Sequence, residues 1–553
     1  MQLLTAFLVW PGAALDAQTA NRITQETDPA RLQALPNHRP LWANAANNMG
    51  LVPANEALAP MTLVLARSPE QEQALEQLFA DQQNPASPEF HHWLTPEEFG
   101  ERFGLSDQDI ATLTGWLQSQ GLHVNWVSPS RIFINFSGTA ADVGQAFGTE
   151  IHYYNVNGNQ RISVSSDPLI PQSLAAAIQS VRGLYTIDDR PLYHMTAPQT
   201  SAPQMTIGSG SSASYFVGPA DFDTIYDVPA SLTGAGQTIG IVSESRTDFA
   251  DFTYFRQQTG ATFSNPTEVV PTAYGGADPG PAYTSPPSSG TSTDLQTEAT
   301  LDVQRSGSVA PGASLLLVVA STASGGVSID AQYLVETSPV PAQVMNISFG
   351  SCESSAGSSS VTFWNTLFQQ AAVEGISVFV SSGDSGASGC DTAFATPPAS
   401  PAANSPNSIC SSSYATCVGG TEFNDASDPS TYWSSANGTG LKSVLSYIPE
   451  GGWNEPGTSG STQVASSGGG VSVYNTPSPS WQTGTGVPAA LAGRYTPDVS
   501  FSASCHDGYF GCRAAAGGSC IAGSSGSYDF VGFCGTSAAA PGMAGVAALL
   551  NQK

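Results

Sequence analysis

The sequence predicts an α/β protein, a doubly wound parallel sheet with helices on both faces, preceded by a smaller α/β sandwich. Four short apolar runs in the second half of the chain are separated by segments of helix length, at 238–242, 314–319, 344–348 and 376–380. Such runs indicate parallel strands buried on both faces, and these sheets bind ligands at the carboxyl ends of their strands. Since 553 residues exceed what one core supports, at least two domains are expected.

The sandwich is expected over residues 30–187, where charge content is ordinary and helical patterns alternate with short strands. Thr95 and Glu98 have capping-box spacing and open a helix. Periodicity then predicts further elements, namely a helix over 107–120, a strand over 131–136 and a helix over 139–147.

Two segments flank the sandwich. Residues 1–20 resemble the apolar half of a secretory signal, without its positively charged start. Residues 188–215 are rich in Ser, Ala, Pro, Gln and Gly, which favours a flexible or cleavable linker. The larger domain occupies 216–553, where Gly/Ser/Pro-rich stretches at 271–294 and 454–486 are interpreted as long surface loops.

Composition limits the partners of this chain. The net charge is −28 and only 11% of residues are charged, so there is no basic surface with which to bind nucleic acid. Apart from the N-terminus, no segment approaches a membrane-spanning length. A surface poor in Lys and Arg suits an exported protein that works in acid, where a cation-rich protein would repel itself.

The cysteine pattern favours disulfides in an oxidising compartment. The chain has 8 cysteines, all between Cys352 and Cys534, and none has CxxC metal spacing. The pairing is open at this point, with local pairs such as Cys410–Cys417 among the candidates.

A nucleophile motif lies near the C-terminus, in Gly535-Thr536-Ser537 followed by a small-residue helix over 538–550. A serine there exposes its hydroxyl and places its backbone N–H at the positive end of a helix, as oxyanion-forming chemistry requires. Pro541 is expected in the first helical turn, where a missing N–H costs nothing. The alternative is a capping Ser or Thr before an ordinary core helix.

The histidines argue against an imidazole base for Ser537. Six lie in the first 200 residues, in a region interpreted as a separate domain, namely His38, His91, His92, His123, His152 and His194. The seventh, His506, is expected to lack an acidic partner nearby in sequence. The base is therefore expected to be a carboxylate, which can still accept a proton near pH 4, where histidine is protonated.

Three acidic residues are candidates for this chemistry. Glu298 and Asp302 are four residues apart in a helix predicted over 293–306, so both lie on one face, where they can share a proton. Asp384 follows a predicted strand in a Gly/Ser-rich turn and, when protonated, can donate a hydrogen bond to an oxyanion. The alternatives are two solvated acids on an exposed face and a turn-forming Asp.

In this order, the motifs resemble the sedolisin family, the serine-carboxyl peptidases. The resemblance runs from about residue 45 to the end and rests on Glu298-x-x-x-Asp302 ahead of Ala310-Pro311-Gly312-Ala313, Ser382-Gly383-Asp384-Ser385-Gly386, Gly468-Gly469-Gly470-Val471-Ser472, Trp481-Gln482, Pro497-Asp498-Val499 and Gly535-Thr536-Ser537. His92-Trp93-Leu94-Thr95-Pro96-Glu97-Glu98-Phe99 resembles the start of the family's activation prodomain.

The resemblance implies a subtilisin-like catalytic domain and an activation prodomain that inhibits it and is removed in acid. It implies that Ser537 is the nucleophile, Glu298 its base, Asp302 the second carboxylate and Asp384 the oxyanion donor. Glu244 is expected to extend the carboxylate network. The protein is expected to be a secreted, monomeric serine-type endopeptidase that acts on proteins or peptides.

Two departures accompany the resemblance. Phe349 stands where relatives often have Trp. Calcium is the expected cofactor, but the family's calcium-binding segment follows the nucleophile, so its ligands are expected beyond Lys553 and the catalytic domain is expected to be incomplete. This leaves a second hypothesis, a catalytically impaired secreted binding protein on a truncated peptidase scaffold. A His-dependent subtilisin-like protease is disfavoured by the scarcity of histidine in the larger domain.

Overall fold

The structure is a computed structural model that describes residues 20–201, 206–207, 214–284, 294–390, 405–456, 464–488, 490 and 492–553. The signal-like segment lies outside the described residues apart from its last residue, as do parts of the linker and of both predicted loops. No helix in these described ranges is long and apolar enough to cross a membrane.

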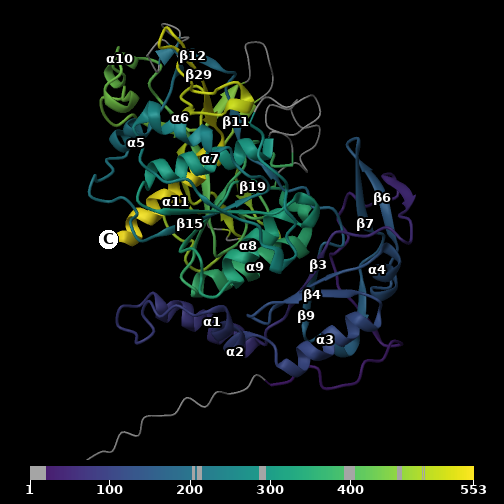
Figure 1. Cartoon of the computed structure of the whole chain (residues 1–553). Coiled ribbons are helices and arrows are strands. Elements are labelled where there is room, and N and C mark those ends of the chain that lie inside the picture. Colours follow the sequence, from purple (N-terminus) through teal and green to yellow (C-terminus); the bar gives the residue numbers. More distant parts are fainter. Residues whose placement is uncertain are drawn as a thin grey trace, which may run out of the picture.

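The larger domain is built on a mixed, mostly parallel eight-stranded sheet (Figure 1). The strand order is β16-β17-β15-β18-β20-β21, and β21 also pairs with β27 and, antiparallel, with β22. The bounds are β15 Thr238–Ser243, β16 Thr267–Val269, β17 Ser314–Val319, β18 Val344–Ile347, β20 Ser377–Ser381, β21 Thr416–Phe423, β22 Glu450–Gly452 and β27 Val499–Ser502. All four predicted strands are therefore confirmed, as is the predicted α/β fold class.

Helices cover both faces of this sheet (Figure 1). Alternation along the strands divides the core, since Ile239 and Ile241 of β15 join one buried cluster and Val242 joins the other. The first cluster includes residues of α5 (Pro219–Ile225), α6 (Phe249–Thr259), α7 (Asp294–Val309) and α11 (Thr536–Gln552). The second includes residues of α8 (Gly326–Glu336) and α9 (Glu353–Val373). Tyr432 of the short α10 (Pro429–Tyr432) packs against the first cluster.

The described part of the N-terminal unit contains a four-stranded and a three-stranded antiparallel sheet, one further pair of strands and four α-helices. One sheet has the order β4-β5-β3-β9, from β3 (Met61–Leu65), β4 (His123–Val127), β5 (Phe133–Ser137) and β9 (Ile178–Arg182). The other joins β2 (Asn48–Leu51), β6 (Ile151–Val156) and β7 (Asn159–Val164), and β1 (Leu32–Ala34) pairs with β8 (Leu169–Pro171). The helices are α1 (Pro69–Gln82), α2 (Pro96–Phe103), α3 (Asp107–Ser119) and α4 (Ala140–Ala146). The predicted capping box of α2 is present.

The two units share a buried interface. The second apolar cluster contains Phe99 and Phe133 of the N-terminal unit together with Phe363 of α9. The Arg182 guanidinium lies 4.8 Å from the centre of the Phe363 ring and donates to the Ser328 hydroxyl at 2.8 Å. The N-terminal unit therefore docks on the α8–α9 face through both apolar and polar contacts.

Four disulfides stabilise the larger domain, namely Cys352–Cys390, Cys410–Cys417, Cys505–Cys534 and Cys512–Cys520. The local Cys410–Cys417 pair is thus confirmed. The predicted loop at 454–486 contains a hairpin of β23 (Asn454–Pro456) and β24 (Val464–Ser466), because backbone pairing prevails over its Gly/Ser-rich composition.

The interface makes stability depend on pH through Glu336. The Ser130 hydroxyl donates to Glu336 at 2.6 Å, yet burial raises the pKa of this carboxyl to about 7. A carboxyl whose pKa is raised by folding is penalised when ionised, so the penalty grows as pH rises from about 4.5 through 7. Glu336→Gln removes this titration.

We therefore expect the melting temperature of Glu336→Gln, relative to its parent, to be higher at pH 7.5 than at pH 4.5. The measurement is a thermal melt of both chains in a Ser537→Ala background, which keeps the two units joined. Glu56→Gln, at an exposed carboxylate, is the matched control and should show no such difference. An equal effect of Glu336→Gln at both pH values would contradict the prediction.

Candidate active site

The helix that carries Ser537 begins directly at the end of a strand. α11 starts at Thr536, two residues earlier than predicted, so Ser537 occupies its first turn. The Ser537 N–H is one of the helix donors without an intrahelical partner. Because of this early start, Pro541 lies inside the helix and the prediction that it occupies the first turn is wrong. Thr536 and Ser537 of this motif are both fully buried.

The structure brings Ser537 and Glu298 together. The Ser537 Oγ–H is 2.9 Å from Glu298 Oε2, with the Ser348 carbonyl as a second acceptor at 3.1 Å. Glu298 lies on α7, which runs alongside α11, and its side chain is buried. The pKa of Glu298 is raised well above its ordinary value, first by burial and then by the neighbouring charge of Asp302.

Asp302 lies one helical turn further along α7 and is buried too. Its Oδ1 accepts a hydrogen bond from the Ser348 hydroxyl at 2.6 Å, and that hydroxyl accepts one from Asn346 at 3.1 Å. Burial raises the pKa of Asp302 well above its ordinary value, although its polar partners oppose the shift. Glu298 Oε1 and Asp302 Oδ2 are buried, and neither accepts a hydrogen bond from the described residues.

Ser348 and Asn346 are functional candidates that sequence reasoning did not identify. Ser348 acts twice, since its carbonyl accepts from Ser537 and its hydroxyl donates to Asp302. The sequence signal was available in Ile347-Ser348-Phe349-Gly350, at the carboxyl end of a predicted strand, where sites are expected. Phe349 is fully buried and contributes packing to the α8–α9 cluster.

Asp384 lies beside the nucleophile, after β20. Its Oδ1 accepts from the Thr536 N–H at 2.8 Å and from the Thr536 hydroxyl at 2.6 Å. The Thr536 hydroxyl in turn accepts from the Gly383 N–H at 3.1 Å. These bonds hold one edge of the Asp384 carboxyl against the start of α11 and leave Oδ2 to face the site.

Residues 190–201 of the predicted linker form short strands across this site. β10 (Arg190–Pro191) pairs antiparallel with β19 (Phe349–Gly350). β11 (His194–Met195) and β12 (Gln199–Ser201) pair antiparallel with β29 (Tyr528–Cys534). The expectation of a flexible segment is therefore wrong for these residues, because strands of the larger domain satisfy their backbone groups.

Leu192 lies between these two pairings and contacts the nucleophile. The Leu192 carbonyl oxygen accepts from the Ser537 N–H at 3.0 Å. The Leu192 N–H donates to the Ser348 carbonyl at 3.1 Å and to Glu298 Oε2 at 3.1 Å. A backbone carbonyl of the chain itself thus occupies the anion-binding position at the N-terminus of α11.

His194 is also brought to the site by the linker. Its Nε2 lies 3.2 Å from Asp384 Oδ2. The prediction that the histidines before residue 200 belong to a region separate from the site is wrong for His194, because β11 returns to pair with β29. The side chain that accepts from the Ser537 hydroxyl is the carboxylate of Glu298.

Glu244 is not brought to the relay. Its pKa is raised to about 7 by burial, and the groups that act on it are Thr322, Val327 and Asp189. It also raises the pKa of Asp330 on α8. Neither Glu298 nor Asp302 is among the groups that act on the Glu244 carboxyl.

His506 and its neighbours form a polar cluster. His506 Nδ1 lies 3.1 Å from Asp507 Oδ1, so the expectation that His506 lacks an acidic neighbour is wrong. This contact raises the pKa of His506 to about 9, and burial raises that of Asp507 to about 7. With Asp425, they are the one group in the described ranges whose ligand atoms, all within 4.8 Å, could hold a metal. Calcium prefers about six to eight oxygen ligands, so two carboxylates and an imidazole do not fit the expected calcium.

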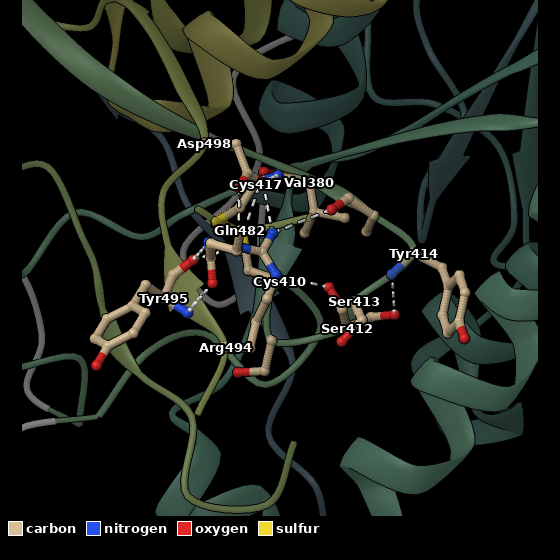
Figure 2. A network of polar contacts seen from close by, with 12 residues as sticks. Val380, Cys410, Ser412, Ser413, Tyr414, Cys417, Gln482, Arg494, Tyr495 and Asp498 are labelled. Carbon is tan, nitrogen blue, oxygen red and sulfur yellow. Dashed lines mark hydrogen bonds and ion pairs between the residues drawn. A yellow bond between two sulfur atoms is a disulfide. The ribbon is translucent and has the colours of Figure 1, made fainter. Parts of the chain in front are cut away.

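A buried arginine fixes the segment that supports the Asp384 turn. Figure 2 shows the Arg494 guanidinium facing Asp498, with Nη1–Oδ1 and Nη2–Oδ2 distances of 2.8 and 2.5 Å. Asp498 also accepts from the Cys417 N–H at 2.8 Å. The residues that follow Arg494 form β26 (Tyr495–Thr496), which pairs with β25 (Gly470–Val471). Two residues before β25, Gly468 donates its N–H to the Gly383 carbonyl at 2.6 Å. The Arg494 network therefore braces the turn that carries Asp384.

Two family models match parts of this chain. Residues 44–187 match the pro-kumamolisin activation domain, and residues 267–553 match the subtilase family. Xanthomonalisin of Xanthomonas sp. (strain T-22) is 28% identical over 483 residues, which cover 83% of this chain and 55% of that protein. Sedolisin of Pseudomonas sp. (strain 101) is 28% identical over 490 residues, which cover 84% of this chain and 76% of that protein.

A solved structure of Pseudomonas sedolisin, described as a serine-carboxyl proteinase complexed with two molecules of pseudo-iodotyrostatin, is 26% identical with a TM-score of 0.43. The match covers 61% of this chain and 81% of the sedolisin chain. This chain spans about half the length of xanthomonalisin.

The parallel sheet and the serine at the start of α11 define a subtilase-type serine peptidase domain. The chain belongs to the subtilase family, and its pro-kumamolisin activation domain and its relatives make it a sedolisin.

Gly535 is required by the close approach of three groups. Its φ is +92°, and a Cβ would lie 2.5 Å from Asp384 Oδ2, 3.0 Å from the Leu192 carbonyl oxygen and 3.1 Å from the His194 backbone nitrogen. Gly526, with φ +79°, has nothing within 4 Å of its Cβ position. Strained φ alone costs of order 1–3 kcal/mol, so both alanine variants should be destabilised by that effect.

We expect Gly535→Ala to be destabilised by clearly more than Gly526→Ala, because only the former must displace neighbours. Urea unfolding of both variants in the Ser537→Ala background measures the difference. Equal midpoints for the two variants would show that the site tolerates a Cβ at Gly535.

Proposed function

We propose that this chain is the zymogen of a secreted serine-carboxyl endopeptidase that hydrolyses proteins or peptides in acid through an acyl-enzyme on Ser537. One observation carries the proposal, namely the buried Ser537 hydroxyl that donates to Glu298 at 2.9 Å. A carboxylate base suits acid, because imidazole is protonated there and cannot accept the proton of the nucleophile.

The first chemical step follows from this contact. Glu298 accepts the Ser537 proton while the serine oxygen attacks the substrate carbonyl carbon. Glu298 then gives this proton to the departing amine, and in the second half of the cycle it activates water against the ester. One carboxyl group therefore serves as base and acid in turn.

The developing oxyanion has two donors in this proposal. The Ser537 N–H already binds a carbonyl oxygen, that of Leu192 at 3.0 Å. A protonated Asp384 supplies the second hydrogen bond from the edge of the site that faces Gly535. A carboxyl can donate only while it holds a proton, which again restricts activity to acid.

Asp302 acts through Glu298. Burial raises the pKa of Glu298, and the like charge of Asp302 raises it further, so the pair keeps its last proton to a higher pH than an isolated glutamic acid. Glu298 is thereby a stronger base when ionised. The Ser348 hydroxyl bond orients Asp302 toward this role.

Several features support zymogen and endopeptidase character. The linker backbone runs through the site on both sides of Leu192, as the chain of an internally cleaved substrate must. The four disulfides favour an oxidising compartment and hence secretion. The hydrogen bond from Ser537 to Glu298 and the burial of Asp302 one turn further along α7 weigh against the alternative of an impaired binding protein.

Ser537→Ala should abolish turnover of an unfolded protein and release of the prodomain, and Glu298→Gln should lower turnover by about 10² or more, because an amide cannot accept the proton. Turnover of acid-unfolded casein at several pH values measures both, with circular dichroism to verify folding. A loss below about tenfold in Glu298→Gln, against the 10²–10⁴ typical of general-base removal, would assign the base elsewhere.

Asp384→Asn keeps a hydrogen-bond donor that does not depend on protonation. We expect lower activity at the optimum but a shallower decline on the alkaline side of the pH profile, because an amide donates at every pH whereas a carboxyl group donates only with its proton. Profiles of kcat/KM for the parent and the variant decide the matter. An alkaline limb of unchanged position and slope would show that Asp384 is not the oxyanion donor.

A further inference from the structure

We infer that the peptide bond between Leu192 and Tyr193 is the bond that this enzyme cleaves to release its own prodomain. The inference rests on the proposed function and adds the position of the cut and the side chain that the site selects. It is carried by the register of residues 190–196 in the site, by the hydrogen bonds of Leu192 and by the pocket beside its side chain.

The carbonyl of Leu192 is placed for attack. Its oxygen accepts the Ser537 N–H at 3.0 Å, and the hydroxyl of the same serine is held by Glu298 at 2.9 Å. Nucleophile, base and polarised carbonyl therefore lie together at the start of α11. Asp384 Oδ2 and the Leu192 oxygen also lie against the same Gly535, within 2.5 and 3.0 Å of its Cβ position.

Strand pairing on both sides fixes the register. Upstream, Pro191 is opposite Phe349 and Arg190 is opposite Gly350. Downstream, His194 is opposite Cys534, three residues before the nucleophile, and Met195 is opposite Phe533. The Thr196 N–H extends this pairing to the Gly532 carbonyl at 2.8 Å. Leu192 and Tyr193 are the two residues that lie between the paired segments.

A shift by one residue in either direction is chemically disfavoured. The residue at the attacked position donates its N–H to the Ser348 carbonyl, as Leu192 does at 3.1 Å. A shift that placed Pro191 there would lose this bond, because proline has no N–H. A shift in the other direction would place the larger Tyr193 in the position of Leu192 and turn the alternating side chains to opposite faces.

The pocket beside Leu192 explains why this residue is accepted. Leu192 is 9% exposed and contributes to a pocket whose other lining includes Gly350, Ser382, Gly383, Gly386 and Gly468. The space left beside Leu192 is about 20 Å³, so a much larger side chain would require this pocket to widen. Glycine backbone, serine hydroxyls, Arg190, Asp384 and Asn407 make up this lining, so its small volume, rather than an apolar wall, limits the side chain that a substrate can place there.

The reaction balances with groups already present and water. The Ser537 oxygen bonds to the Leu192 carbonyl carbon and its proton passes to Glu298. The Leu192–Tyr193 C–N bond then breaks, and Glu298 returns the proton to the Tyr193 nitrogen, which becomes the new amino terminus. Water hydrolyses the Leu192 ester, its proton passing through Glu298 to the Ser537 oxygen, and leaves a carboxyl group on Leu192.

The first test is the identity of the earliest cut. The purified full chain is acidified and sampled over time by intact mass measurement and N-terminal sequencing. The first products should be a fragment that ends at Leu192 and a partner that begins at Tyr193, with neither in Ser537→Ala. If the enzyme degrades casein but its first cut lies at another bond, the assignment is overturned and the proposed function stands.

The second test addresses the pocket. Leu192→Lys should slow release of the prodomain at least tenfold, because its longer side chain exceeds the space left beside Leu192 and its ammonium group must lose water there. Ala197→Lys, an exposed position five residues downstream, is the matched control and should process at the parental rate. Equal rates for the two variants would overturn the assignment.

A synthetic peptide of residues 186–199 keeps the test independent of folding of the variants. Processed enzyme should cleave it after Leu192 and should cleave the Leu192→Lys peptide at least tenfold more slowly. Cleavage at another bond, or equal rates for both peptides, would overturn the assignment of the Leu192–Tyr193 bond and leave the proposed function standing. Absence of casein turnover and of processing at every pH would instead overturn the proposed function, and the assignment with it.

Discussion

The close approach of α7 to α11 is the constraint on which the candidate site depends, because one helix carries both relay carboxylates and the other carries the nucleophile. Small residues permit it. A Cβ at Gly545 would lie 2.6 Å from Val309, and one at Gly542 would lie 2.9 Å from the Arg305 guanidinium. Arg305 in turn donates to the Ala538 carbonyl at 3.2 Å, one residue after the nucleophile. The run of alanine and glycine after Ser537 therefore serves the site as well as the core.

This arrangement buries two acids where charge is costly. The raised pKa values of Glu298 and Asp302 reflect that cost, because each ionised carboxylate has lost its hydrating water. Hydrogen bonds from Ser537 and Ser348 offset part of it. A pair that holds one proton between its members carries a single charge, which is cheaper to bury than two. The chemistry and the stability of this region thus favour the same protonation state.

Local patterns predicted the elements, and pairing over long distances determined much of the site. The four buried strands, the helix with Glu298 and Asp302 and the capping box at Thr95 all follow from periodicity or spacing of a few residues. The position of Asp384 next to Thr536 was suggested only by family motifs, because 152 residues separate the two.

The failures have the same cause. The linker composition gave no sign that residues 190–195 pair with β19 and β29, and so the approach of His194 to Asp384 was missed. Ser348 was overlooked because its function depends on a helix elsewhere in the chain. Pro541 was misplaced by a two-residue error in the start of α11, the kind of boundary that sequence patterns locate least well.

The linker strands have a kinetic consequence. While the chain is intact, the segment around Leu192 is tethered to the site on both sides and competes with any external substrate at a very high effective concentration. Once the backbone is cut, only non-covalent contacts, namely the α8–α9 interface and the pairing of β10 with β19, hold the new carboxyl end in the site, and that association becomes bimolecular. Dilution then favours dissociation. A peptidase exported into a large volume would therefore be freed by the same step that separates it from the cell that made it.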